Sequence, residues 1–323
     1  MNKKIIPHNS LSIGLEEKIV TLNVLQSGWL TSADQVEYFE NDICKYFSLP
    51  KGHAIVVSSG SAALYLALWA LKGKKKRVGI PVYSCCSLRN ATNLIGGRPV
   101  YLDSSAENPN INIENVKNKG LDILIAPSMY GIPVRLKNKL PFKVIEDISQ
   151  AIGSEYNGKK IGLRGDVGIC SFASTKLITS GGQGGAIISK NKNIIQELKD
   201  FRDFDNRDDD KIRFNFLMTN MQAAIGRAQL KKLKSFIESR ERIFQNYLNS
   251  GLNLLDSPNS DLSAVRHRAL LINSNPEKII SLLRKEKISS IVPLRTTELL
   301  DSKRKYNNAE WFTNNFVALP MYP

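Results

Sequence analysis

Residues 58–64, with the sequence SSGSAAL, have the composition of a phosphate-binding turn. They follow an apolar run at 54–57 and precede an apolar stretch from 61 to 71, so a strand should pass into a helix here. The first amide groups of a helix have no partner within it and lie at its positive end, which favours an anion. The segment has neither the Gly-Lys-Ser/Thr of a P-loop nor a GxGxxG motif. Taken alone, it also fits a helix that is simply capped by serine.

Two further polar segments contain an acid and a lysine that could take part in catalysis. Residues 146–151 (EDISQA) follow an apolar pair, and a carboxylate such as Asp147 at a strand end needs a cation or several donors beside it. Residues 170–185 (CSFASTKLITSGGQGG) place Lys176 between an apolar run and a glycine-rich turn. In isolation, Asp147 could equally cap a helix, and Lys176 could be a solvated surface charge.

Taken in chain order, the three segments match the needs of pyridoxal 5′-phosphate (PLP). This cofactor requires an anion cradle, a carboxylate for its pyridinium N–H and an amine that forms an imine with it. The sequence therefore favours a PLP site, provided that the fold brings the three segments together.

The surrounding pattern predicts such a fold. Short apolar runs alternate with helical stretches from about residue 54 to 147, which is typical of a mostly parallel sheet flanked by helices. Parallel strands direct their carboxyl ends to one edge, where open α/β sheets bind ligands. After residue 166 the expected strands, 167–173 and 185–189, lie closer together, so the sheet should end as a mixed one.

Helical segments are expected before and after this α/β region. Residues 12–48 have apolar residues at helical spacing, and residues 221–247 form a long amphipathic segment that should join two domains. We therefore predict a large domain over 1–245 and a small, shortened α+β domain over 246–323. The small domain should contain a strand at 268–272, a helix at 276–285 and a strand near 317–319.

Composition restricts the partners and the compartment. Lys plus Arg (45) exceed Asp plus Glu (30), giving a net charge of +15 that favours anionic ligands. The basic residues are scattered, and the one local cluster, 72–77, fits a solvated loop better than a nucleic-acid site.

Four cysteines without metal-ligand spacing predict reduced thiols and no metal. With no signal peptide and no apolar run longer than 62–71, we expect a cytoplasmic protein without an integral membrane segment.

Several motifs together resemble the DegT/StrS family of PLP-dependent sugar aminotransferases, which have fold type I, the aspartate aminotransferase-like fold. The shared motifs run in order along nearly the whole chain: SGWLT at 27–31, SGSAALYLAL at 59–68, PVYS at 81–84, EDxxQA at 146–151, SFxxTK at 171–176, RFNFLMTNMQAAIG at 213–226 and LPMYP at 319–323. Each motif alone is weak evidence for the family, but the order in which all of them occur along the chain is specific to it.

The resemblance implies a role for each matching residue. Lys176 would form the imine with PLP and then carry the proton between substrate and cofactor. Asp147 would pair with the ring nitrogen, which keeps the ring an electron sink, and Gln150 would contact the O3′ side of the ring.

The phosphate and substrate positions also follow from the resemblance. Ser61, with the N–H of Ala62, and Ser171 would hold the phosphate from two sides. Asn215 would reach the phosphate of the neighbouring subunit's cofactor, which implies a homodimer with shared sites. Thr31 matches a position on the substrate side.

The sequence also departs from the family pattern. Cys85 stands where many members place an aromatic ring against the cofactor, so the cofactor ring should be held more weakly, or by a thiol and neighbouring apolar atoms. Gln183 replaces the glutamate of a Gly-Glu-Gly-Gly turn, with one extra residue before it. A histidine often found near the substrate is missing from 293–297, and relatives usually continue beyond Pro323 through a final helix.

Transamination is the leading functional hypothesis. Glutamate or glutamine would give its amino group to a keto group of a nucleotide-linked sugar, for surface polysaccharide or secondary-metabolite sugar biosynthesis. A dehydratase branch of the family has His in place of the imine-forming lysine, and Lys176 argues against it. The alternative is a catalytically altered relative that acts as a binding or assembly partner; purified protein without the yellow colour of PLP would favour it.

Overall fold

The computed structural model describes residues 4–136, 139–257 and 261–323. Within these residues, a seven-stranded sheet forms the centre, in the order β1-β9-β8-β5-β4-β2-β3. Its strands are β1 (Ala54–Val57), β2 (Arg77–Pro81), β3 (Arg98–Leu102), β4 (Ile123–Pro127), β5 (Lys143–Asp147), β8 (Val167–Ser171) and β9 (Gly185–Ile188). Neighbouring strands are parallel from β3 to β8, and β9 is antiparallel to both β1 and β8. The expected mostly parallel, mixed sheet is confirmed.

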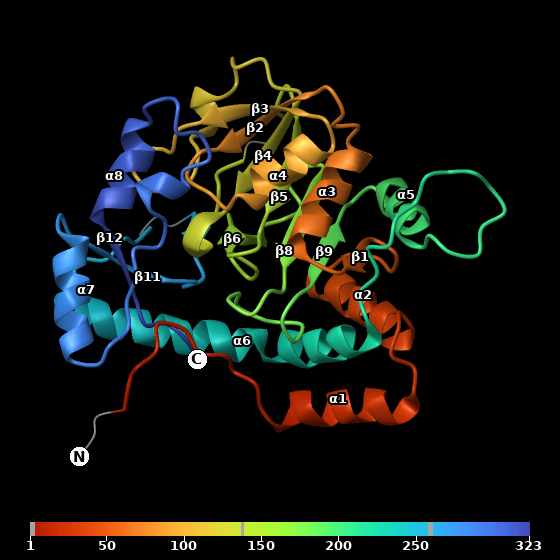
Figure 1. Ribbon diagram of the computed structural model, residues 1–323, viewed down its shortest axis with the longest axis horizontal. Helices are drawn as coiled ribbons and strands as arrows, with labels where there is room; N and C mark the ends of the chain where they lie inside the picture. Colours follow the sequence, from red (N-terminus) through yellow and green to blue (C-terminus); the bar gives the residue numbers. More distant parts are fainter. Residues whose placement is uncertain (1–3, 137–138, 258–260) are drawn as a thin grey trace.

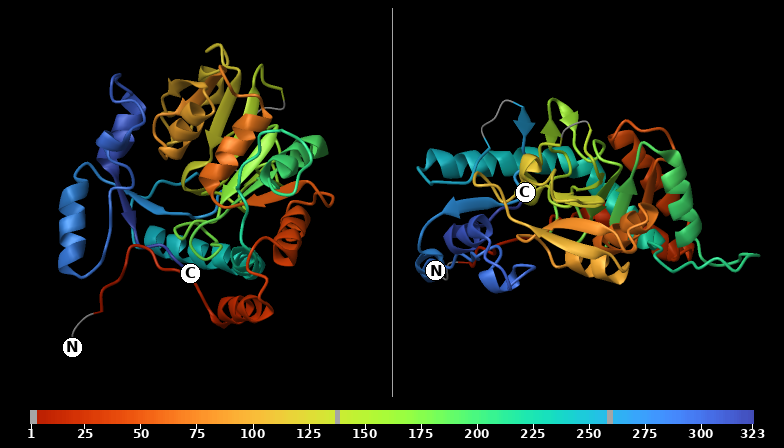
Figure 2. Two further views of the ribbon diagram at one scale, coloured as in Figure 1. Left: turned by 45° about the vertical axis from the view of Figure 1, so that its right-hand side comes forward. Right: turned by 90° about the horizontal axis from the view of Figure 1, so that it is seen from above.

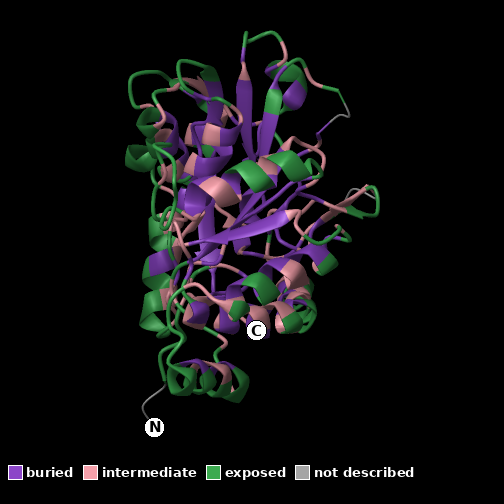
Figure 3. Ribbon diagram, turned by 90° about the vertical axis from the view of Figure 1, so that its right-hand side faces the viewer, coloured by how far each residue is buried: buried purple, intermediate pink, exposed green. Residues whose placement is uncertain are grey.

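Helices cover both faces of this sheet, which explains why its strands are apolar runs without polar alternation. On one face, α3 (Gly60–Ala70) packs against β8 and β9 and lies beside α4 (Ser87–Leu94) and α5 (Lys192–Arg202). On the other face, α2 (Asp34–Tyr46) and the long α6 (Asn220–Asn249) share a buried cluster with β1, β8 and β9. Figure 3 shows the central strands as the most deeply buried part of the chain.

The C-terminal part packs at one end of α6 (Figure 2). It contains an antiparallel pair, β11 (Ala269–Ile272) and β12 (Phe316–Leu319), with α7 (Pro276–Lys285) and α8 (Asn307–Asn315). A small separate sheet joins β10 (Leu262–Ser263) to β6 (Glu155–Tyr156) and β7 (Lys159–Lys160). Three short 3-10 turns complete the elements: η1 (Ile113–Asn115), η2 (Met129–Gly131) and η3 (Thr296–Glu298). The helix expected at 276–285 is present, and the domain division at residue 245 stays a prediction.

The N-terminal segment differs from the expected helical stretch over 12–48. It forms two helices, α1 (Leu15–Ser27) and α2, because Gly28 adopts a left-handed conformation (φ 72°) that ends α1. The apolar row of α1 faces away from the chain: Leu15, Ile19, Leu22 and Leu25 are between 46 and 71% exposed. Among the described residues, no helix combines the length and apolar character needed to cross a bilayer.

A buried ion pair ties α2 to the sheet and to α5. Glu40 is 4% exposed and accepts hydrogen bonds from Arg202 (2.6 Å), Lys199 (2.6 Å) and the amide of Val56 on β1 (3.2 Å). The Arg202 guanidinium is equally buried and also donates to the Val56 carbonyl. Since a buried charge without its partner is costly, this contact fixes α2 against the end of the sheet near the α3 turn.

We expect Glu40→Ala to lower the free energy of unfolding by about 3 kcal/mol, because the buried Arg202 guanidinium loses its buried carboxylate and keeps only the more exposed Asp203 and the Val56 carbonyl as partners. Urea unfolding of the variant beside the parent chain measures this loss. The matched control is Glu37→Ala on the same helix, whose ion pair with Lys51 is solvent-exposed and should contribute little. Equal losses in the two variants would show that the buried pair does not stabilise α2.

Candidate active site

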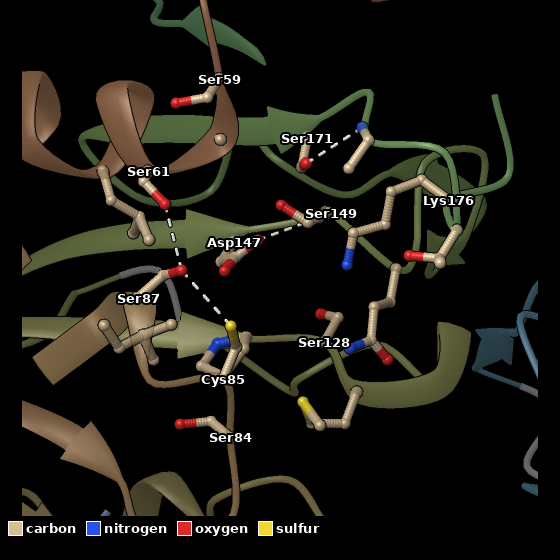
Figure 4. A pocket seen from close by; sticks show the side chains of 18 of the residues that line it. Ser59, Ser61, Ser84, Cys85, Ser87, Ser128, Asp147, Ser149, Ser171 and Lys176 are labelled. Carbon is tan, nitrogen blue, oxygen red and sulfur yellow. Dashed lines mark hydrogen bonds between the residues drawn. The ribbon is translucent and has the colours of Figure 1, made fainter. Parts of the chain in front are cut away.

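A cavity of about 370 Å³ lies at the carboxyl edge of the parallel strands (Figure 4). Its lining comes from the segments that follow β1, β2, β4, β5 and β8, as the strand-end argument predicts. Six of the residues expected from the sequence line it: Ser61, Cys85, Asp147, Gln150, Ser171 and Lys176. Segments more than 100 residues apart in the chain therefore meet at one place.

The N-terminus of α3 forms one wall of the cavity. Ser59 caps the helix, and its hydroxyl accepts the amide of Ala62 at 3.1 Å. Ala62 was the expected amide donor for the phosphate, but its N–H is used by this cap. The free amide groups at this end are those of Gly60 and Ser61, which have no hydrogen-bond partner among the described residues.

Gly60 allows α3 to close onto the end of β8. A Cβ atom at Gly60 would lie 2.7 Å from the Ser171 Cβ and 2.9 Å from its Oγ, so any other residue would push the helix away. The Ser171 hydroxyl thus lies directly at the helix N-terminus, where it accepts the amide of Ala173 at 3.3 Å. On the other side, the Ser61 hydroxyl donates to Ser87 at 3.1 Å. Two hydroxyls and two free amides therefore line this end of the cavity.

Two adjacent carboxylates at the end of β5 have different surroundings. Glu146 accepts the backbone amides of Gly162, Arg164 and Gly165, so it serves the structure. Asp147 faces the cavity, is 8% exposed and accepts the amide of Ser149 at 2.9 Å. Burial raises the pKa of the Asp147 carboxyl, opposed by its hydrogen bonds to Ser149 and by the Lys176 charge. A cation beside Asp147 would keep its carboxylate ionised.

Lys176 projects from the turn that follows β8. The turn is held by the Lys176 amide, which donates to the Ala173 carbonyl at 3.0 Å, and by the Ser174 amide, which donates to Gly182 at 3.1 Å. Gly182 has a φ of 134°, which L side chains rarely adopt, so a glycine is required there. Figure 4 shows the Lys176 side chain extending into the cavity, where its charge acts on the Asp147 carboxyl.

Gln150 and Cys85 complete the expected lining. The Gln150 side-chain oxygen accepts the amide of Tyr130 at 2.8 Å, which leaves its NH₂ group as the free end. The Cys85 thiol donates to Ser87 at 3.3 Å. The described residues that line the cavity include no aromatic side chain, and the apolar part of the lining comes from aliphatic and thioether side chains such as Leu64, Leu88 and Met129.

Thr31 and Asn215 lie outside this cavity. Both are exposed; the Thr31 carbonyl accepts the amide of Asn220 at 3.1 Å, and the Asn215 side chain accepts the amide of Leu217 at 3.1 Å. Asn215 belongs to the segment between α5 and α6, which projects from the body of the molecule in Figure 1. Within one chain, the structure does not bring these two residues to the site.

The sequence analysis missed several polar lining residues, among them Ser84, Ser87, Ser128, Ser149 and Thr175. Ser128 directly follows β4, so the strand-end rule that selected Asp147 could have found it. Ser84, Ser149 and Thr175 stand in motifs that the sequence itself offered, but the residue pattern assigned them no role, and Ser87 is the first residue of α4.

The fold and the sequence both match known proteins. DesV of S. venezuelae, solved in complex with a ketimine intermediate, superposes with a TM-score of 0.90 at 24% identity, over 99% of this chain and 94% of DesV. This likeness confirms fold type I.

Two relatives match at higher identity. GDP-perosamine synthase of Escherichia coli O157:H7 is 30% identical over 286 residues, which are 84% of this chain and 78% of the relative. UDP-4-amino-4,6-dideoxy-N-acetyl-beta-L-altrosamine transaminase of Campylobacter jejuni is 31% identical over 236 residues, 68% of this chain and 62% of the relative. The sequence model of the DegT/DnrJ/EryC1/StrS aminotransferase family matches residues 12–323. This protein therefore belongs to the DegT/DnrJ/EryC1/StrS aminotransferase family, as the order of its motifs predicted.

Proposed function

We propose that this protein uses PLP to move an amino group from glutamate or glutamine to a keto group of a nucleotide-linked sugar. The observation that carries the proposal is the meeting of three groups in one cavity: the Lys176 amine, the Asp147 carboxylate and the free amides of α3. When bound, PLP supplies an electron sink that allows an amino group to leave one carbon and join another.

The residues present fit this cofactor. The free amides of Gly60 and Ser61, with the hydroxyls of Ser61 and Ser171, would hold its phosphate at the positive end of α3. The buried Asp147 carboxylate, whose pKa is raised by burial, would be stabilised by a protonated ring nitrogen. The free NH₂ of Gln150 would donate to the O3′ side of the ring.

Lys176 has the two properties that the chemistry requires of the protein. Among the described lining residues it is the one primary amine, so it can bind a carbonyl carbon covalently. Once released, the same amine lies within the cavity and can take a proton from a substrate carbon or return it. Asp147 and Ser149 lie on the polar side of the site, and the Lys176 charge favours the ionised form of the Asp147 carboxyl.

The printed names of the two relatives support the substrate class, because they give GDP- and UDP-linked compounds. The net charge of +15 is consistent with a ligand that carries a diphosphate. We propose a nucleotide-linked keto-sugar as amino acceptor, in the biosynthesis of surface polysaccharide or of secondary-metabolite sugars. The exposed thiols of Cys85 and Cys86 fit a reducing compartment, and we place the protein in the cytoplasm.

We also propose a homodimer in which each subunit completes the other's site. Asn215 and Thr31 lie outside the cavity of their own chain, and the projecting segment exposes Ile212 (86%) and Phe214 (63%) beside Asn215. The apolar row of α1 is exposed as well, and exposed apolar side chains that gather in this way are typical of surfaces that bind another protein. A second copy related by twofold symmetry would cover it and bring Asn215 to the neighbouring cofactor phosphate.

We expect PLP to be attached to Lys176. Borohydride reduction of the purified protein, followed by peptide mapping, should find the adduct on this residue, and Lys176→Ala should abolish turnover, because no other amine lies in the described lining. The control Lys190→Ala removes an exposed lysine after β9 and should keep both adduct and activity. An adduct on another lysine would refute the assignment, and protein without any adduct would favour the catalytically altered relative.

Asp147→Asn should retain PLP but slow the half-reaction with the amino donor by about 100- to 1000-fold, the usual loss when one preorganised electrostatic partner is removed. The amide has the same shape but cannot stabilise a charged ring nitrogen. Stopped-flow absorbance with glutamate or glutamine measures the rate. Asp122→Asn, on the segment entering β4 at the opposite edge, is the matched control. A rate within about twofold of the parent rate would show that another acid pairs with the ring nitrogen of the cofactor.

Shared sites can be tested by mixing two inactive variants, Lys176→Ala and Asn215→Asp. Loss of the Asn215 donor should weaken cofactor retention by about 1–3 kcal/mol, and the added carboxylate repels the phosphate further. A mixed dimer would hold one doubly altered site and one with intact Lys176 and Asn215, so about half-site activity should return. If no activity returns in a mixture that mass spectrometry shows to contain mixed dimers, Asn215 does not serve the neighbouring site.

A further inference from the structure

A histidine from the C-terminal part contacts the turn that carries Lys176. His267 lies two residues before β11, and its Nε2 is 3.2 Å from the carbonyl oxygen of Thr175, the residue preceding Lys176. Among the described residues, the other hydrogen bonds to residues 173–176 all come from within 171–182. His267 therefore provides the one described hydrogen bond from a distant part of the chain to residues 173–176.

The imidazole of His267 is uncharged in this position. It is 6% exposed, and burial lowers its pKa well below the usual value, as do the charges of Arg268, Lys176 and Arg240. A neutral imidazole has a single N–H, and the Thr175 carbonyl can only accept, so the proton must reside on Nε2. Nδ1 is then a buried acceptor without a hydrogen-bond partner among the described residues.

The backbone of His267 is fixed from three sides. Its amide donates to the carbonyls of Val265 (3.1 Å) and Tyr130 (3.4 Å), and its carbonyl accepts Nη1 of Arg240 at 3.2 Å. Arg240, on α6, is 3% exposed and also donates to the Met321 carbonyl at 3.0 Å. The backbone that carries the ring is thus held in place, and the contact with Thr175 orients the ring itself, as a group that positions another requires.

The unpaired Nδ1 indicates that packing alone does not account for this residue. An apolar side chain of similar size would fill the same space without burying an unsatisfied acceptor, whose cost is about 1–3 kcal/mol. A lysine or arginine could also donate to Thr175 but would add a second positive charge beside Lys176. Histidine in its uncharged form provides the donor without that charge.

We infer that His267 is a positioning residue for Lys176: it holds the Thr175 carbonyl so that the lysine amine points into the cavity. The inference rests on the proposed role of Lys176 but adds a part of the site that lies outside the cavity lining. It also makes the placement of the lysine depend on the C-terminal part of the chain.

The test compares His267→Gln with His267→Asn. Both side chains are uncharged amides, but only glutamine is long enough to place an N–H where Nε2 lies. Hydrogen exchange measured by mass spectrometry on peptides covering 173–183 should be about 10-fold faster in His267→Asn, the loss of roughly one hydrogen bond, and close to the parent in His267→Gln. The apolar variant His267→Met should resemble His267→Asn if it folds.

Kinetics provides the second readout. We expect kcat to fall about 10-fold in His267→Asn with the KM for the sugar nearly unchanged, because the substrate contacts remain while the amine is displaced. His267→Gln should restore kcat. Unchanged exchange in His267→Asn, or equal defects in the two amide variants, would overturn the inference. The exchange result does not depend on catalysis, so it stands or falls separately from the proposed function.

Discussion

The burial of the Asp147 carboxylate at the end of β5 is the constraint on which the site depends. A carboxylate with so little exposure needs a nearby cation or donors, and the sheet provides them from the neighbouring strand. Asp147 lies opposite Ile169 on the parallel strand β8, so the residues that follow β8, including Ser171 and Lys176, emerge on the same edge. The parallel register thus places an amine beside the acid without any local sequence relation between them.

Close backbone approach at the other end of the cavity depends on two glycines. Gly60 lets α3 meet the side chain of Ser171, and Gly185, at the start of β9, leaves room for the Ser59 carbonyl, which a Cβ would approach to 2.3 Å. Without these glycines, the β1-α3 turn could not lie over the ends of β8 and β9. The free amides of α3 and the acid at β5 would then no longer face one cavity.

The site also depends on parts that lie far from its lining. The buried pair of Glu40 and Arg202 fixes α2 near the α3 turn, and His267 joins the lysine turn to the C-terminal part. By contrast, the apolar row of α1 and the segment around Asn215 have no such support, because both are exposed in a single chain. The site of this chain therefore has supports within the chain, while two apolar segments of the same chain stay uncovered.

The sequence by itself determined the strands of the central sheet, the chain order of phosphate turn, acid and lysine, and hence the family, because these follow from local apolar runs and strand ends. It could not decide that α1 turns its leucines outward, since periodicity shows that a helix has an apolar face but not what covers it. The serine cap of α3 is a local contact that the sequence already offered, but the sequence could not assign the Gln150 oxygen to the Tyr130 amide. Nor could it pair His267 with Thr175, 92 residues apart. Such contacts are decided only when packing brings distant backbone groups within hydrogen-bond distance.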